Sequence, residues 1–367
     1  MQHNVREIAS HFDIWGDFLW YERYGSGHIN DTYLIVFNQA GYQVRYILQR
    51  INTSIFKKPD ELMENIARVL DYCKRQLAGR KDATRRSLTL LGTTDGKTYH
   101  TDAEGNAWRA YLFIERARTY DVLESPKFAY EAAKAFGSFQ KLLAGMPGER
   151  LHEVIPNFHN TPSRLADFDK ALAEDKLGRS ASAKAEIEFV QSHRDMAGVF
   201  VDLLAKGGIP ERVTHNDTKI NNVMLDDETG EGVCVIDLDT IMPGVSLYDF
   251  GDLVRTSVSP AAEDEKDLSK VQARMEMFEA LAKGFIEGFG GCLTPKEIEL
   301  MPFSGELITF EIGIRFLTDY LQGDTYFKTH REGHNLDRCR TQFTLVQRLM
   351  DHEEEMKKIV ADVVAGK

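Results

Sequence analysis

Short stretches of strand-like composition, separated by tight turns, occupy the first third of the chain, whereas apolar residues at helical spacing dominate the other two thirds. Residues 24–36 are predicted to form a strand, a glycine-bearing turn and a second strand, and further strands are predicted over 42–51, 88–93, 97–101 and 107–115. Successive strands joined by such turns indicate an antiparallel sheet. Because the composition becomes helical after Arg116 and stays so, we place a lobe boundary there, between one lobe over 1–116 and another over 117–367.

Apolar residues that recur every three or four positions predict the helices. In the first lobe, a short helix is expected within 4–15 and a longer one over 59–78, where Pro59 suits the first turn. The second lobe has predicted helices over 126–145, 164–174, 183–206, 264–290, 295–322 and 336–363, and another that begins near Leu253. The pattern thus predicts an α+β chain of two lobes, one built on a sheet and a larger one that is mainly helical.

The composition narrows the classes of protein that fit. With 367 residues, the chain is long enough for two lobes, and a hydrophobic content of 43% is ordinary for a folded protein. The net charge of −12 argues against a nucleic-acid partner. No stretch approaches the roughly 20 apolar residues of a membrane span, and residues 1–15 lack the apolar core of a signal peptide. Four cysteines without CxxC spacing predict neither a zinc site nor a disulfide framework, so we expect a cytoplasmic protein.

The most informative stretch is 213–239, which reads as strand, loop, strand, turn and strand. Asp217 lies in the first loop, Asn222 follows five residues later, and Asp237 ends an apolar run. This ordered set is typical of a kinase-type phosphoryl-transfer centre. Asp217 is suited to accept the proton of an attacking hydroxyl, and Asn222 and Asp237 supply oxygen ligands that suit magnesium bridging nucleotide phosphates.

Other polar residues of the same region take supporting roles. Lys219, two residues beyond the loop aspartate, is expected to reach the transferring phosphate and offset its charge. His215 is expected to hold the loop backbone rather than to transfer protons. For Asp239 two roles are open, a second metal ligand or a contact to the loop backbone. Asp249 and Asp252 precede the next predicted helix, and we expect both to cap it.

A turn in the first lobe is the candidate phosphate-binding loop. It contains Gly25 and Gly27, and glycines at a hairpin let backbone amides approach phosphate oxygens. Two glycines are also typical of an ordinary hairpin, so the assignment depends on the downstream motif. His28, in the same turn, is either a substrate contact or a plain turn residue.

Residues 215–222 and 236–244 resemble the aminoglycoside-phosphotransferase and choline-kinase-like superfamily, and within it the bacterial N-acetylhexosamine 1-kinases. The likeness extends through 25–30, 46–49, 52–56, 159–162, 175–179, 263–270 and 302–305, so it covers nearly the whole chain. The resemblance implies a bilobal protein-kinase-like fold and phosphoryl transfer from ATP, with Mg²⁺, to the anomeric hydroxyl of N-acetylglucosamine or N-acetylgalactosamine. In such enzymes the residue matching Asp217 is the catalytic base, and Asn222 and Asp237 match the metal ligands.

The resemblance also implies where the nucleotide lies. The strand end with Phe113 and Glu115 would be the interlobe hinge that meets adenine. The usual strand lysine, which grips the α- and β-phosphates, is replaced by Gln49, with Arg50 next to it. Because neighbouring residues of a strand point to opposite faces, either Gln49 serves by hydrogen bonding or a local bulge turns Arg50 inward.

The acceptor pocket is expected at the helix predicted over 295–322. Arg315 and Asp319 are four residues apart and share a face of this helix. A surface ion pair is the alternative, but the apolar neighbours indicate a buried helix, in which a bare charge pair is costly. Tyr326 follows the helix and could stack on or bond to a sugar ring. The resemblance favours Arg315 and Tyr326 as sugar contacts. It adds His28, Arg255 and Thr256 as residues that close the pocket.

Two other functions stay open. One is a kinase of another small alcohol, such as choline, homoserine or an aminoglycoside, because a net charge of −12 is compatible with an acidic pocket. The other is a pseudokinase-like module that binds nucleotide without turnover, although the intact Asp217, Asn222 and Asp237 argue against it. No apolar stripe marks an interface, so we expect a monomer or a weak homo-oligomer whose ligands are a nucleotide and a small sugar.

Overall fold

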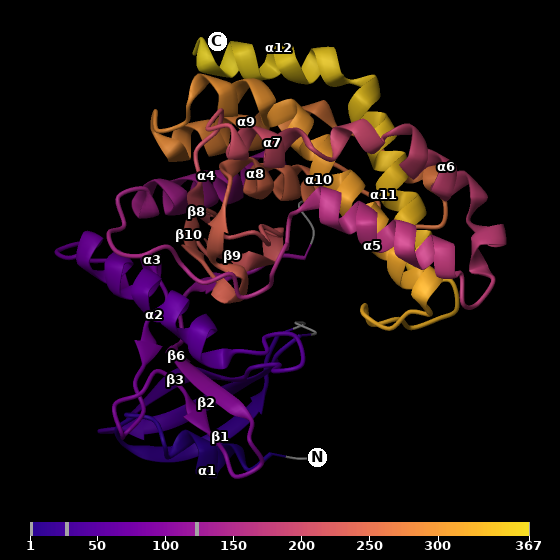
Figure 1. Ribbon diagram of the computed structural model, residues 1–367. Coiled ribbons are helices and arrows are strands. Elements are labelled where there is room, and N and C mark those ends of the chain that lie inside the picture. The colour runs from indigo at the N-terminus through magenta and orange to yellow at the C-terminus, as the bar shows by residue number, and fades with distance from the viewer. Residues whose placement is uncertain (1–2, 26–28, 122–124, 367) are drawn as a thin grey trace.

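The computed structural model describes residues 3–25, 29–121 and 125–366. A lobe built on a sheet lies at the bottom of Figure 1 and a larger helical lobe above it. The predicted α+β architecture, with an antiparallel sheet first and a mainly helical lobe second, is confirmed. Within the described ranges, no helix combines the length and the apolar character needed to cross a membrane.

The sheet of the first lobe is antiparallel throughout. Its strands, in spatial order, are β1 (Asp17–Arg23), β2 (Asp31–Gln39), β3 (Tyr42–Arg50), β6 (Ala107–Leu112) and β4 (Leu90–Leu91), and β5 (His100–Thr101) also pairs with β6. Alternate residues of β2, Tyr33, Ile35 and Phe37, are buried in one cluster with Trp108 of β6. Because this face is apolar and closed, the polar residues of β3 and β6 that face the other way are directed toward the second lobe.

The structure adjusts the bounds of two predictions at the start of the chain. The two strands predicted on either side of the glycine turn are present, but β1 already ends at Arg23 and β2 starts only at Asp31. The short helix expected within 4–15 is α1 (Val5–Ala9). It stops early because Phe12 forms an isolated bridge with Thr93, which draws the following backbone onto the sheet lobe.

The second lobe is assembled around long helices. Its helices are α4 (Pro126–Leu143), α5 (Thr161–Glu174), α6 (Lys184–Ser192), α7 (Val199–Ala205), α8 (Ser246–Ser257), α9 (Met275–Phe289), α10 (Pro295–Gln322), α11 (His334–Asp351) and α12 (Glu353–Val364). Two further helices, α2 (Pro59–Gln76) and α3 (Ala83–Arg86), belong to the first lobe. Helices α4 and α9 approach closely at glycines, since a Cβ on Gly137 would lie 2.5 Å from the carbonyl oxygen of Phe285. A larger residue there would force the two helices apart.

Several helix boundaries differ from the prediction. The helix predicted over 264–290 starts only at Met275, and the one predicted over 336–363 is divided into α11 and α12. The helix predicted over 183–206 is divided into α6 and α7 by a 3₁₀ turn at 194–196. The helix predicted to begin near Leu253 begins at Ser246, because the apolar residues before Leu253 are themselves helical and buried. As a result, Asp249 and Asp252 lie inside α8 and not in front of it.

Two small sheets hold the central loops of the second lobe. β7 (Ala117–Arg118), β9 (Val223–Asp226) and β10 (Gly232–Val235) form one, and β8 (Arg212–Thr214) and β11 (Met242–Gly244) form the other. The loop 215–222 therefore leaves one sheet and enters the other, and the loop 236–241 returns in the opposite direction. The lobe boundary predicted after Arg116 stays a prediction, although β7 directly follows it and pairs with β9.

Candidate active site

A buried carboxylate, that of Asp249, holds the backbone of the loop 215–222. Asp249 accepts hydrogen bonds from the backbone N–H groups of His215, at 2.9 Å, and Asn216, at 2.7 Å. It also accepts one from the side chain of Gln140. Burial raises the pKa of Asp249, while the His215 side chain and these donors oppose the rise. The predicted helix-capping role of Asp249 was wrong, because α8 starts earlier and carries Asp249 under the loop.

His215 holds the two loops together, as predicted. Its Nε2 lies 2.8 Å from the carbonyl oxygen of Ile236, directly before Asp237. On the other side of the ring, Nδ1 accepts the backbone N–H of Asp217 at 3.3 Å. One side chain thus links the backbone of Asp217 to the residue that precedes Asp237.

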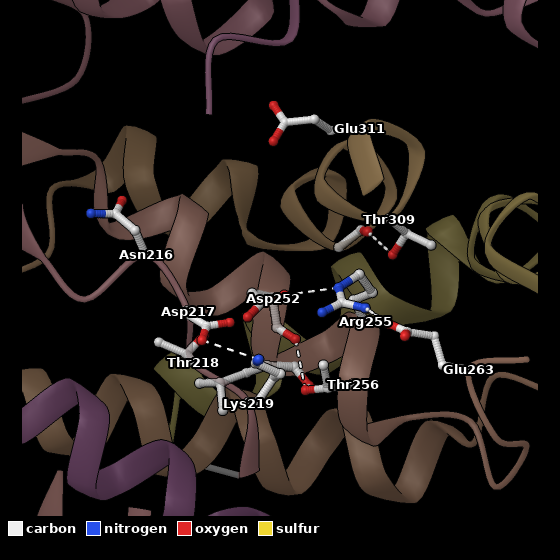
Figure 2. Close-up of polar contacts among 12 residues, drawn as sticks. Asn216, Asp217, Thr218, Lys219, Asp252, Arg255, Thr256, Glu263, Thr309 and Glu311 are labelled. Atoms are coloured by element: carbon white, nitrogen blue, oxygen red, sulfur yellow. Dashed lines mark hydrogen bonds and ion pairs between the residues drawn. The ribbon is translucent and has the colours of Figure 1, made fainter. Parts of the chain in front are cut away.

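Asp217 lies between a cation and an amide. Lys219 Nζ is 3.1 Å from Asp217 Oδ2, and Asn222 Nδ2 donates to the backbone oxygen of Asp217 at 2.8 Å and to its Oδ2 at 3.1 Å. Figure 2 shows the Asp217–Lys219 pair at the mouth of the loop. Burial would raise the pKa of Asp217, but Lys219, through its charge and its hydrogen bond, together with His215 and Arg255 outweighs the effect of burial and holds the pKa below its usual value. Asp217 is therefore a charged carboxylate at neutral pH, able to orient a hydroxyl.

Asp237 and Asn222 are the candidate oxygen ligands for a metal. Asp237 takes a left-handed backbone conformation with φ 56°, and burial followed by the charges of Asp239 and Asp217 raises its pKa to about 6. In the described part of the chain, no three His, Cys, Asp or Glu side chains form a complete metal cage. Magnesium needs only one or two protein ligands when phosphates and water complete its shell, so this donor set fits it.

Asp239 has a role that sequence reasoning missed. One carboxylate oxygen, Oδ1, is ion-paired with Arg109 of β6, and the other accepts from Asn30 Nδ2 at 2.6 Å. Neither of the two predicted roles, metal ligand or loop contact, describes these bonds. Arg109 was not singled out in the sequence, although a charged residue inside the apolar strand 107–112 was a signal for it.

The register of β3 shows which of Gln49 and Arg50 faces the cavity, at the place where a strand lysine is usual. Pairing with β2 is regular through Gln49 opposite Thr32 and Arg50 opposite Asp31, so no bulge turns Arg50 inward. Arg50 Nε donates to Asp31 at 2.8 Å. Of the two alternatives left open by the sequence, the bulge that would turn Arg50 inward is therefore not formed. Gln49 Nε2 donates to Thr32 Oγ1 at 3.0 Å, and Gln49 faces the cavity between the lobes.

A cavity of about 220 Å³ lies between the lobes. Among the residues lining it are Gly25, Gln49, Arg109, Phe113, Asn222 and Asp237. The hinge side is formed by Leu112, Phe113 and Ile114, whereas the carboxylate of Glu115 is ion-paired with Arg45. The side chain of Glu115 is thus engaged at the surface, and its predicted contact with the nucleotide stays a prediction. Gly27 and His28, predicted for the phosphate loop and the acceptor pocket, lie outside the described residues.

Arg315 of α10 is surrounded by three aromatic side chains. Its guanidinium carbon is 5.2 Å from the ring centre of Phe158, 5.5 Å from that of Phe327 and 5.8 Å from that of Tyr326. The surface ion pair with Asp319, which was the alternative to a pocket role, is not formed. Asp319 instead accepts the backbone N–H groups of Tyr326, at 2.7 Å, and Phe327, at 2.9 Å. Both of its oxygens are occupied in this way, so Asp319 fixes the loop that carries Tyr326, and its contact with a substrate stays a prediction.

Arg164 of α5 is a second cation at this place, and sequence reasoning missed it. Arg164, Arg315, Asp319 and Tyr326 line a cavity of about 260 Å³. Burial lowers the pKa of Arg164, and the charge of Arg315 lowers it further. Its Nε is buried without a hydrogen-bond acceptor in the described structure. Only packing of α5 against α10 brings these two arginines together, so no local pattern could have found the pair.

Arg255 and Thr256, predicted to close the acceptor pocket, are tied to α8 and the segment after it. Arg255 is buried and ion-paired with Asp252 at 2.8 Å and with Glu263 at 3.0 Å, as Figure 2 shows. Thr256 Oγ1 donates to the backbone oxygen of Asp252 at 2.8 Å. Asp252 therefore pairs with Arg255 and does not cap a helix, contrary to the prediction.

A further buried pair joins α10 to the loop 215–222. His159 lies between Glu311 and the backbone oxygen of Asn216. Thr161 Oγ1 donates to the second oxygen of Glu311 at 2.6 Å. The likeness of residues 159–162 to known kinases was a signal that this segment matters, but its connection to Glu311 spans about 150 residues and required the fold.

Comparison with known proteins places this geometry in a family. A model of the phosphotransferase enzyme family matches residues 20–282. The fold is similar to an aminoglycoside phosphotransferase from Alicyclobacillus acidocaldarius, with a TM-score of 0.62, 12% identity, and coverage of 97% of this chain and 96% of that one. It is also similar to an ethanolamine kinase of Plasmodium vivax, with a TM-score of 0.53, 18% identity, and coverage of 87% and 80%.

A choline kinase of Cryptosporidium parvum is similar as well, with a TM-score of 0.53, 13% identity, and coverage of 92% of this chain and 90% of that one. At these identities the structural likeness establishes the fold alone. It does not identify the acceptor, which has to be argued from the chemistry of the pocket. The family match spans well over half of the chain and includes the loops 215–222 and 236–241. The protein therefore belongs to the phosphotransferase enzyme family, a family of small-molecule kinases.

Proposed function

We propose that this protein is an N-acetylhexosamine 1-kinase, which transfers the γ-phosphoryl group of ATP to the anomeric hydroxyl of N-acetylglucosamine or N-acetylgalactosamine. The observation that carries the proposal is the environment of the Arg315 guanidinium group. This group has no carboxylate at ion-pair distance within the described ranges, and it fills the space between three aromatic rings. Such a group offers N–H donors to a carbonyl oxygen, as on an acetamide.

The same observation argues against a cationic acceptor. Quaternary ammonium ligands are bound inside aromatic cages, and here the protein's own guanidinium occupies the cage. Arg164 adds a second positive charge at the same cavity. A choline or an aminoglycoside would meet two arginines at this cavity. Two carboxylates also line it: Asp319 is occupied by backbone N–H groups, and Asp167 lies 3.9 Å from Arg164 and so is offset by that charge.

The nucleotide is proposed to lie in the cavity between the lobes. The hinge residues Leu112 to Ile114 form its apolar end, and Gln49, Asn222 and Asp237 form its polar end. An apolar cleft with a few convergent polar groups at one end suits a base and its phosphates. Bound magnesium would neutralise charge on the phosphates, and Asn222 and Asp237 would hold it with their oxygens.

The proposed chemistry is a direct transfer. The acceptor hydroxyl donates a hydrogen bond to Asp217, its oxygen forms the new bond to phosphorus, and the bond from phosphorus to the leaving oxygen of ADP breaks. The hydroxyl proton passes to Asp217 late in the step. An anomeric hydroxyl is more acidic than other sugar hydroxyls, so a carboxylate with a low pKa, as Asp217 has, is an adequate base. Lys219, paired with Asp217, is positioned to offset charge on the transferring group.

The acceptor class is tested by initial rates of ADP release with a panel of alcohols at equal concentration. N-acetylglucosamine and N-acetylgalactosamine should be turned over far faster than glucosamine, choline, homoserine or kanamycin. Glucosamine is the matched control, because it differs from N-acetylglucosamine by the acetyl group alone and carries a positive charge. Preferred turnover of choline, homoserine or kanamycin would establish the alternative, a kinase of another small alcohol.

A further inference from the structure

Strand β6, which pairs with β3 at Gln49, places a cation in the cavity between the lobes. Arg109 of β6 stands directly opposite Gln49 of β3 in the register of the sheet. Residues directly opposite each other on antiparallel strands have side chains on the same face. The side chain of Arg109 therefore enters the cavity that Gln49 faces, whereas Arg50 is directed to the other face and bonded to Asp31.

Arg109 is the only lysine or arginine among the described residues that line this cavity. Its guanidinium is 1% exposed and ordered by two contacts. Nε donates to Gln49 Oε1 at 3.1 Å, and Nη1 is bonded to Asp239 Oδ1. For Nη2, no protein acceptor lies at hydrogen-bond distance within the described structure, so this nitrogen keeps its donors for another ligand.

Asp239 holds Arg109 across the two lobes. Asp239 follows β10 in the second lobe, while Arg109 and Asn30 belong to the first. Asn30 is itself anchored, because its Oδ1 accepts the backbone N–H of Asn52 at 3.0 Å. Both oxygens of Asp239 are thus engaged by the first lobe, which makes Asp239 an interlobe anchor and leaves Asp237, two residues earlier, as the carboxylate that lines the cavity.

We propose that Arg109 is the phosphate-binding cation of the first lobe, supplied from β6 in place of the missing strand lysine. In this arrangement Asp239 orients Arg109 and is not a metal ligand. Gln49 completes the arrangement by accepting from Nε, which explains why an amide suits the lysine position here: a second cation beside Arg109 would be repelled, whereas an amide oxygen orients it. The inference rests on the nucleotide half of the proposed function and is independent of which alcohol is the acceptor.

The test compares the binding of adenosine with that of ADP, because only ADP carries the phosphates. Affinities are measured by isothermal titration calorimetry without acceptor, for the wild type, Arg109→Met and the control Arg50→Met. We expect Arg109→Met to weaken ADP binding by roughly tenfold to a hundredfold, the range of a hydrogen bond to a charged group, and to change adenosine binding by less than about twofold. Arg50→Met should change neither. Equal weakening of adenosine and ADP, or unchanged ADP binding, would overturn the proposal.

A second pair of variants separates phosphate binding from folding. Arg109→Met leaves the buried carboxylate of Asp239 unpaired, so the double variant Arg109→Met/Asp239→Asn removes both charges at once. It should show the same selective loss of ADP binding, at a higher melting temperature than Arg109→Met alone. In Asp239→Asn, the magnesium concentration that half-saturates ADP binding should stay within about twofold of the wild-type value. A tenfold shift would make Asp239 a metal ligand and contradict the assignment.

These readouts fail independently of the acceptor assignment. If N-acetylhexosamines are not substrates but ADP binding depends selectively on Arg109, the proposed acceptor is wrong and the assignment of Arg109 stands. If N-acetylhexosamines are substrates but ADP binding does not depend on Arg109, the proposed acceptor stands and the assignment of Arg109 is wrong.

Discussion

His159 Nε2 lies 2.9 Å from the carbonyl oxygen of Asn216, the residue directly before Asp217. On its other side, His159 Nδ1 lies 2.8 Å from Glu311 Oε1. Both partners are acceptors, so both ring nitrogens donate and the imidazole is positively charged. Arg315 stands one helical turn beyond Glu311 on α10. The helix that carries the candidate acceptor contact is therefore fastened to the loop that carries the candidate base.

The buried pair of His159 and Glu311 should make stability depend on pH. Burial alone would lower the pKa of His159, but the Glu311 carboxylate raises it above its ordinary value. A group whose pKa rises on folding contributes stability that is fully present below its unfolded pKa, about 6.5, and is lost as the pH climbs through the folded pKa. The pKa of Glu311 is lowered, since His159 outweighs the effect of burial, and its contribution is lost as the pH falls through the folded pKa.

We therefore predict that His159→Gln loses about 3–5 kcal/mol of unfolding free energy at pH 6, the usual cost of breaking a buried charge pair, and less at pH 9. Urea unfolding at the two pH values measures the difference. The double variant His159→Gln/Glu311→Gln is the control, because it leaves no unpaired charge and should recover part of the loss. A loss that does not change between pH 6 and pH 9 would contradict a charged His159.

The carboxylate of Asp217 should be needed for turnover and not for nucleotide binding. Asp217→Asn keeps the size of the side chain and removes the base, which should reduce kcat by on the order of 10²–10⁴. Its ADP affinity should stay within about threefold of wild type, as calorimetry without acceptor would show. A variant that retains wild-type kcat would remove Asp217 from the role of base.

The two arginines of the acceptor cavity should act on the acceptor alone. Arg315→Ala should raise the acceptor KM by roughly tenfold to a hundredfold, because a hydrogen bond from a charged group contributes about 1.5–3 kcal/mol, with little change in the KM for ATP. Arg164→Ala should act in the same direction. Arg50→Ala, an arginine on the far face of β3, is the matched control and should change neither constant. Equal increases in both KM values would indicate that Arg315 supports the fold instead.

Asp249 should govern the order of the loop 215–222. In Asp249→Asn, one acceptor oxygen becomes an NH₂ group that faces a backbone N–H, so one of the two loop bonds is lost. We expect a loss of about 1–3 kcal/mol of unfolding free energy and faster hydrogen exchange at His215 and Asn216. Gln140→Leu removes a donor to the same carboxylate but leaves both backbone bonds, and should preserve the slow exchange. Unchanged exchange in Asp249→Asn would show that other contacts hold the loop.

The sequence predicted those features that are local in the chain. Asp217, Lys219, Asn222 and Asp237 lie within one stretch of the sequence, so their spacing alone indicated phosphoryl-transfer chemistry. The helices with long apolar stripes, such as α2 and α10, were predicted close to their observed bounds for the same reason. The start of α8 was misplaced because the stretch before Leu253 reads locally as a loop, and only burial in the second lobe makes it helical.

Features that depend on register or packing were not predictable. Arg109 enters the nucleotide cavity only because β6 pairs with β3 at Gln49, and a sequence does not specify which residues face each other across strands. Arg164 approaches Arg315 only through the packing of α5 on α10. The missing lysine at position 49 and the charged residue inside the apolar strand 107–112 were the signals in the sequence that a cation comes from elsewhere.

The central claim, transfer to the anomeric hydroxyl of an N-acetylhexosamine, is tested most directly by the product. The enzyme is incubated with ATP, Mg²⁺ and N-acetylglucosamine, and the product is characterised by phosphorus-31 NMR with proton coupling. We predict one phosphomonoester whose phosphorus couples to the anomeric proton, with ADP formed in equal amount. A phosphorus coupled to the two C6 protons, or no phosphorylated N-acetylhexosamine at all, would contradict the account.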